Sequence, residues 1–189
     1  MTDKIRCAWC GSDPLYMEYH DVEWGTPVYE DQKLFEFLIL ETFQAGLSWI
    51  TILRKRENFR KAFDSFDYNK VSQYKEEKIG ELMMDAGIIR HAAKIKATIA
   101  NAAAFMEVQK EFGSFSKYIW NFTTGKPIVN SWKTLTEVPA TTPLSDQISR
   151  DLKHRGFKFV GSTVMCAYMQ ATGMVDDHVA YCWKRTSKS

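Results

Sequence analysis

The segment from Leu34 to Trp49 is strongly apolar, yet it carries an acidic residue, Glu41, where a helix would bury it. Leu34, Phe37 and Leu38 precede this acid by seven, four and three residues, so on a helix they share its face. A buried carboxylate is costly because desolvation disfavours the ionised form. One interpretation is a core glutamate satisfied by backbone amides or an arginine. The other is that Glu41 lines a pocket for a ligand that donates hydrogen bonds or carries positive charge.

Aromatic residues that could stack on a flat ligand lie on both sides of this acid in the sequence. Segment 46–48 is expected to break the first helix, and Ser48 to cap a second helix that begins at Trp49. A pocket that receives a base turned out of DNA requires such stacking side chains, although aromatic clusters more often form only core. The aromatic candidates are Trp9, Tyr16, Tyr19 and Trp49. A buried acid one short turn from an indole indicates a pocket for a flat cation.

Two cysteines and two histidines near the chain ends could bind a metal ion: Cys7, His20, His178 and Cys182. His178 and Cys182 are four residues apart, so on a helix they point the same way. Two thiolates and two imidazoles complete a closed, structural zinc site that would link the two ends of the chain. Residues so far apart in sequence need not meet, and Cys10 could replace Cys7, because Cys7-Ala-Trp-Cys10 is itself a metal-type pair.

A turn with basic residues could contact DNA phosphates. Gly87 lies in a turn before a helix, whose N-terminal amides favour anions. Arg90, His91 and Lys94 follow it, and a second basic group comprises Arg150, Lys153, His154, Arg155 and Lys158. The alternatives are an ordinary interhelical turn with a solvated basic face and a helix C-terminus with favourable charge.

Helical periodicity dominates the chain, and alternating strand patterns are nearly absent, so the sequence predicts an all-α fold. Residues 1–33 are expected to be irregular with one helical turn, and 123–144 to form the longest loop. A last turn or two is expected over 177–183. Helices are expected from 34 to the break at 46, then over 49–63, 75–84, 90–112, 114–122, 145–155 and 161–173, with Ser145 capping the sixth of the seven.

The composition excludes several classes of protein. The 189 residues suit a single compact unit, and 25 Lys+Arg against 23 Asp+Glu give a net charge of +2, so DNA binding would need local basic patches. The longest apolar run contains Glu36, Glu41 and Gln44, so no membrane span is expected. Four cysteines without a signal peptide indicate a cytoplasmic protein with thiols that are free or bound to metal.

Several motifs in order along the chain resemble the 3-methyladenine DNA glycosylase I family, within the helix-hairpin-helix superfamily. They are Asp13-Pro-Leu-Tyr16, Tyr19-His20-Asp21, Glu23-Trp24-Gly25, Gln44-Ala-Gly-Leu-Ser-Trp49-Ile-Thr, Asp85-Ala-Gly-Ile-Ile-Arg90-His91, Arg155-Gly-Phe-Lys-Phe-Val-Gly161, and Asp177-His178 with Cys182. The chain departs from the family pattern at Thr42-Phe43. In the hairpin, Ile89 stands where the superfamily usually has its second glycine.

The resemblance implies a base-excision repair enzyme that hydrolyses the N-glycosidic bond of 3-methyladenine in double-stranded DNA and releases the free base. It also implies a structural zinc ion on Cys7, His20, His178 and Cys182, which favours Cys7 over Cys10. The implied base pocket comprises Trp9, Tyr16, Tyr19, Glu41 and Trp49, with Glu41 and Tyr19 as its catalytic residues. From the basic turn, the second basic group and the turn after Glu41, we expect DNA contacts at Gly46, Leu47, Gly87, Arg90, His91, Lys94 and Lys158.

Most of the superfamily places a catalytic aspartate after the hairpin, whereas this chain has no aspartate between Asp85 and Asp146. No lysine is obviously positioned as a Schiff-base nucleophile, so we expect a monofunctional, monomeric glycosylase without lyase activity. We expect a helix-hairpin-helix core over 34–160 and a zinc-binding annex formed by 1–33 with 161–189. The alternatives are a zinc-stabilised DNA-binding module without catalysis, and a zinc hydrolase whose metal keeps an open position for water.

Overall fold

The computed structural model describes residues 4–186 and is mostly helical, in agreement with the all-α prediction. Its helices are α1 Pro14–Val22, α2 Asp31–Gln44, α3 Trp49–Ala62, α4 Tyr68–Val71, α5 Glu76–Met84, α6 Ala92–Phe112, α7 Phe115–Asn121, α8 Pro143–His154, α9 Ser162–Ala171 and α10 Trp183–Thr186. Short 3-10 turns cover Ala8–Cys10 (η1), Asp64–Phe66 (η2) and Leu135–Glu137 (η3), and the strands are β1 Ile128–Val129 and β2 Val175–Asp176. No helix in this part of the chain combines the length and the apolarity that crossing a membrane requires.

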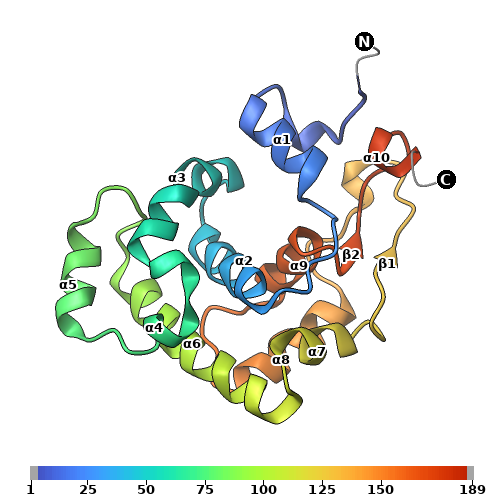
Figure 1. Ribbon diagram of the computed structural model, residues 1–189. Helices are drawn as coiled ribbons and strands as arrows, with labels where there is room; N and C mark the ends of the chain where they lie inside the picture. Colours follow the sequence, from blue (N-terminus) through green and yellow to red (C-terminus); the bar gives the residue numbers. More distant parts are fainter. Residues whose placement is uncertain (1–3, 187–189) are drawn as a thin grey trace.

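Helix α2 is the centre of the fold, with α3 and α9 on either side of it (Figure 1). Every side chain from Leu34 to Phe43 is buried, because α2 is apolar on nearly all faces and other helices surround it. It begins at Asp31, whose carboxylate accepts hydrogen bonds from the backbone amides of Phe115 and Ser116 at the start of α7. Glu41 therefore occupies a fixed position in the core.

The first predicted irregular segment contains a full helix. Pro14 occupies the first turn of the nine-residue α1, and the side chain of Asp13 accepts hydrogen bonds from the amides of Leu15 and Tyr16. The expectation of a single helical turn was wrong, although Asp13-Pro14 is a normal helix-start signal. The result matters because α1 carries Tyr16, Tyr19 and His20.

Other boundaries also differ from the prediction. Thr142, not Ser145, caps α8: its side chain accepts from the amide of Ser145, and the Ser145 hydroxyl accepts from the amide of Thr142. Ser48 precedes α3 as expected, but its side chain makes no cap hydrogen bond to the helix. The segment between His178 and Cys182 is a turn, so these two residues do not share a helix face.

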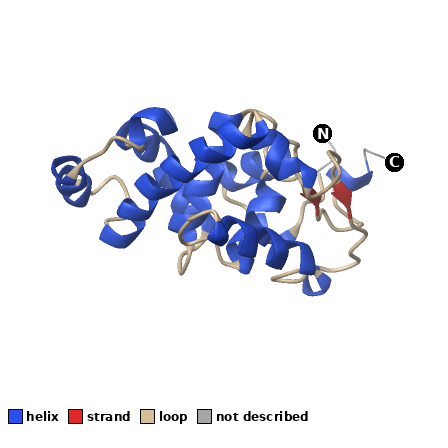
Figure 2. Cartoon of the chain, turned by 90° about the horizontal axis from the view of Figure 1, so that it is seen from below, coloured by secondary structure: helices blue, strands red, loops and turns tan. Residues whose placement is uncertain are grey.

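The long predicted loop contains one strand of a parallel pair. Ile128 pairs with Val175, and Val129 with Asp176, which joins the loop to the segment after α9. Figure 2 shows the two strands at one end of an otherwise helical molecule. A two-residue strand is too short to produce an alternating pattern, so neither strand can be predicted from sequence.

Candidate active site

A cavity of about 370 Å³ contains all five predicted pocket residues in its wall. Helices α1, α2, α3 and α9, η1, and the chain around η3 contribute to it. Its lining residues are Trp9, Tyr16, Tyr19, Trp24, Glu41, Gln44, Trp49, Leu135, Val138, Pro139, Ala167, Gln170 and Asp177. The volume lies within the range of small-molecule sites, and the wall is largely aromatic and apolar with a few polar groups.

Glu41 is 3% exposed, and its Oε2 atom has no hydrogen-bond partner among the residues that the structure describes. Burial raises the pKa of this carboxyl group to about 8, because the ionised form loses its hydration and gains no partner. An unpaired buried carboxyl group in a cavity wall provides a hydrogen-bonding site for a ligand, and a cationic ligand would stabilise its ionised form.

Glu36, on the same helix, shows the opposite arrangement. It is also buried, but its Oε1 accepts hydrogen bonds from Arg56 Nε at 2.5 Å and Arg60 Nη2 at 2.8 Å. Arg56 also donates to both carboxylate oxygens of Glu23. Arg56 and Arg60 therefore stabilise Glu36, which is not part of the cavity wall, and neither arginine pairs with Glu41.

Aromatic rings form the walls beside Glu41. The ring centroids of Tyr19 and Trp49 are 5.4 Å apart, and those of Trp9 and Tyr16 are 5.0 Å apart. Tyr16 and Tyr19 are three residues apart on α1, so one face of this helix presents both. Burial raises the pKa of the Tyr19 phenol well above its usual value, so this group stays neutral. Among the described residues, the buried indole N–H groups of Trp9 and Trp49 have no acceptor.

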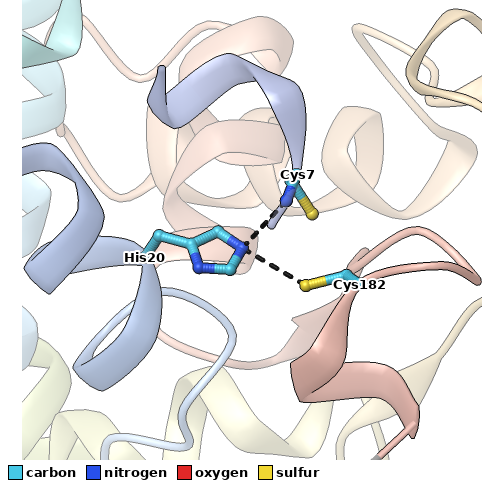
Figure 3. A group of neighbouring side chains, drawn as sticks. All are labelled: Cys7, His20 and Cys182. Carbon is cyan, nitrogen blue, oxygen red and sulfur yellow. Dashed lines mark hydrogen bonds between the residues drawn. The ribbon is translucent and has the colours of Figure 1, made fainter. Parts of the chain in front are cut away.

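A second group of residues brings the two ends of the chain together (Figure 3). Cys7, His20 and Cys182 form a possible metal-binding group, with ligand atoms that all lie within 4.8 Å of one another. Cys182 Sγ is 3.4 Å from His20 Nε2. A hydrogen bond with the Cys7 thiol lowers the pKa of the Cys182 thiol. Cys10 is not part of this group; its thiol donates to the Cys7 carbonyl oxygen at 3.2 Å.

His178, the fourth predicted ligand, lies beside this group. Its ring centroid is 5.1 Å from that of His20, and its buried Nε2 has no partner in the described part of the chain. Its Nδ1 is 2.6 Å from Asp176 Oδ1, and His20 Nδ1 is 2.9 Å from Asp21 Oδ1. Carboxylates that hold the second ring nitrogen are typical of metal-binding histidines. The two thiols and two imidazoles, one of which has an unpaired buried nitrogen, therefore fit a closed zinc site.

Comparisons with known proteins identify the family of the chain. The family model described as methyladenine glycosylase matches residues 9–185. The chain belongs to this family. It is 50% identical over 177 residues to DNA-3-methyladenine glycosylase 1 of Escherichia coli strain K12. The aligned region covers 94% of this chain and 95% of that protein. It is also 47% identical over 182 residues to the DNA-3-methyladenine glycosylase of Haemophilus influenzae strain Rd. This aligned region covers 96% of the chain and 98% of that protein.

Solved structures of the methyladenine glycosylase family have the same fold. A crystal structure of 3-methyladenine DNA glycosylase I matches with a TM-score of 0.93 and 46% identity over 95% of this chain and 98% of that one. A Staphylococcus aureus structure described as the structural basis of 3-methyladenine recognition matches with a TM-score of 0.92 and 36% identity over 95% and 96%.

The turn between α2 and α3 presents two of the predicted DNA-contact residues. Leu47 is 40% exposed, and Gly46 has a φ of +86°, which favours glycine. Arg90, His91 and Lys158 are also exposed. These five residues are therefore accessible to a strand of DNA.

The other two predicted DNA contacts are engaged within the protein. Lys94 is buried, and its ammonium group donates to the carbonyl oxygens of Phe43 and Ala45, each at 2.9 Å. The amide of Gly87 donates to Asp85 Oδ1 at 2.7 Å, so it is not free for a phosphate. In this methyladenine glycosylase, Lys94 therefore caps the C-terminus of α2, and the expectation that its ammonium group contacts phosphate does not fit its position.

Four polar or aromatic residues of the cavity wall were not predicted as pocket residues: Trp24, Gln44, Gln170 and Asp177. Gln44 was accessible to sequence reasoning, because it follows Glu41 by three residues on the same helix. Gln170 and Asp177 come from α9 and the segment after it, and no local pattern places them opposite Glu41.

Proposed function

We propose that this protein removes 3-methyladenine from alkylated double-stranded DNA by hydrolysing its N-glycosidic bond. The proposal is supported chiefly by the position of Glu41 in the wall of an aromatic cavity. This acid is buried, and its Oε2 has no hydrogen-bond partner among the described residues. The names of the relatives support the same substrate.

The chemistry needs little assistance. A purine alkylated at N3 is already cationic, so it is a good leaving group and its glycosidic bond is weak. Turning the damaged base out of the duplex costs a few kcal/mol, on the order usual for base extrusion. In the cavity, Tyr16, Tyr19 and Trp49 stack on the ring, and Trp9 completes the aromatic wall. Water then attacks the sugar as the bond breaks.

Glu41 and Tyr19 are the proposed catalytic residues. Glu41 accepts hydrogen bonds from the edge of the base and stabilises its positive charge in a site that excludes water. The neutral phenol of Tyr19 holds the ring of the bound base against Trp49. We propose a monofunctional enzyme, since neither residue is a nucleophilic amine of the kind that lyase chemistry uses.

Exposed residues outside the cavity wall hold the DNA. Arg90, His91 and Lys158 contact phosphates, and Gly46 with Leu47 approach the gap that the extruded base leaves. Cys7, His20, His178 and Cys182 would hold a zinc ion, whose contribution there is structural.

The test is to incubate the protein with methylated duplex DNA and to identify the released bases by chromatography. We expect free 3-methyladenine and an intact DNA backbone at the abasic site. Binding to DNA without release of a base would instead support the DNA-binding module. Cleavage of the backbone by the purified protein would contradict a monofunctional enzyme.

A further inference from the structure

Asp177 holds Gln170, a residue of the cavity wall, by a hydrogen bond. Asp177 is buried, and its Oδ1 accepts hydrogen bonds from Asn130 Nδ2 at 2.7 Å and from Trp132 Nε1 at 2.6 Å. Its Oδ2 accepts from Gln170 Nε2 at 2.8 Å. Both Asp177 and Gln170 line the cavity, so this network extends to the surface that meets a ligand.

The network determines the orientation of the Gln170 amide. The Asp177 carboxyl oxygens are the acceptors of all three hydrogen bonds, and the indole N–H of Trp132 can only donate. Gln170 must therefore turn its NH₂ group towards Asp177, which leaves its carbonyl oxygen on the other side. Within residues 4–186, this Oε1 atom accepts no hydrogen bond, although the side chain forms part of the cavity wall.

The geometry points to Gln170 as a specificity-determining residue whose Oε1 accepts a hydrogen bond from the exocyclic amino group of the bound base, with Asp177 as its positioning residue. This inference rests on the proposed function. Adenine derivatives carry an N–H donor at position 6, whereas guanine derivatives carry a carbonyl acceptor there. A carbonyl oxygen fixed in the wall attracts the amino group and repels the carbonyl group. The cavity therefore prefers methylated adenine to methylated guanine.

The substitution Asp177→Asn reverses the amide. The carbonyl oxygen of the substituted side chain can still accept from Asn130 and Trp132, so its NH₂ group faces Gln170. The Gln170 amide then turns its carbonyl oxygen towards position 177 and its NH₂ group towards the cavity. We expect the kcat/KM ratio for 3-methyladenine over 3-methylguanine to fall about tenfold, since one neutral hydrogen bond contributes about 0.5–1.5 kcal/mol.

A double-mutant cycle separates this role from a merely structural one. Gln170→Met removes the amide, so it should lower the same ratio several-fold. In the Gln170→Met background, Asp177→Asn should change the ratio no further, because no amide remains to be turned. Since position 177 adjoins His178, the zinc content and the thermal midpoint of each variant are measured in parallel. If Asp177→Asn does not fold, the Gln170→Met ratio alone decides.

The outcomes separate the inference from the proposed function. Wild-type protein that releases no methylated base would contradict the proposed function itself. Normal release of 3-methyladenine by the wild type, with an unchanged ratio in Gln170→Met, would overturn the assignment of Gln170. A further loss of selectivity on adding Asp177→Asn to Gln170→Met would overturn the positioning role of Asp177.

Discussion

At the scale of single residues, the two buried glutamates of α2 have opposite surroundings. Glu36 is stabilised by Arg56 and Arg60, whereas Glu41 has no cationic partner and lies in a cavity wall. An unpaired buried acid lowers the stability of the folded state, so it persists where a ligand needs it.

The raised pKa of Glu41 makes stability depend on pH. Its ordinary value is 4.5 and its value in the folded protein is about 8. Between these pH values the folded protein keeps a proton that the unfolded chain has lost, so the free energy of unfolding falls as the pH rises. Glu41→Gln should reduce this fall by a few kcal/mol, on the scale of about 1.4 kcal/mol per pKa unit. Urea titrations at pH 5 and pH 8 measure the fall in the free energy of unfolding. An equal fall in the wild type and in Glu41→Gln would contradict the raised pKa of Glu41.

Residue types in sequence predicted the members of the cavity wall better than the positions of the basic residues. Glu41 could be recognised because an acid interrupts an apolar helix face. Lys94 could not, because a basic residue after a turn has the same sequence signature whether it contacts phosphate or caps another helix. Only the packing of α6 against α2 distinguishes the two cases.

At the scale of elements, the C-terminus of α2 positions both Glu41 and the exposed turn at Gly46 and Leu47. Lys94 stabilises this end by donating to the last carbonyl groups. Lys94→Met should therefore lower the free energy of unfolding by about 1–3 kcal/mol, since the buried carbonyl of Phe43 and the part-buried carbonyl of Ala45 lose their donor. Chemical denaturation measures the change, and a loss below a few tenths of a kcal/mol would argue against the cap.

Lys158 is the matched comparison, because it is exposed and of the same residue type. Lys158→Met should weaken binding to DNA of any sequence and reduce the slope of log K against log salt by about 1, with little change in stability. Lys94→Met should leave this salt slope unchanged. Fluorescence anisotropy at several salt concentrations measures both slopes, and a reversed order would contradict the two assignments.

Elements with strong local signals were predictable, and elements that depend on tertiary contacts were not. The periodicity of α2, α3 and α6 located these helices within a few residues. The strand pair and the turn from His178 to Cys182 depend on partners more than 40 residues away, including Asp177 with Asn130. No window of local sequence contains that information.

At the scale of the whole molecule, the first and last segments that the structure describes meet. The amide of Trp183 donates to the carbonyl oxygen of Ile5 at 2.8 Å, and Cys7 and His20 lie beside Cys182. From sequence alone it was open whether the four predicted metal ligands come together. In the structure, three of them do: Cys7, His20 and Cys182. The division into a core over 34–160 and an annex, the monomeric state and the cytoplasmic location stay predictions.

Cys182→Ser should remove most of the bound zinc and lower the thermal midpoint by about 4–8 °C, which for a chain of this length corresponds to about 2 kcal/mol. Metal analysis and thermal unfolding measure the two effects. Cys10→Ser is the control, because Cys10 is buried nearby but lies outside the group; it should keep its zinc. Full zinc occupancy in Cys182→Ser would contradict the ligand assignment.

The central claim is that Glu41 receives the cationic base, and the rate of 3-methyladenine release from methylated duplex DNA tests it most directly. Glu41→Gln should lower this rate by about 10- to 100-fold, since hydrogen bonds to charged groups contribute about 1.5–3 kcal/mol. Glu36→Gln, which removes the paired acid of the same helix, should lower stability but keep the rate per folded molecule. An unchanged rate in Glu41→Gln would contradict the account.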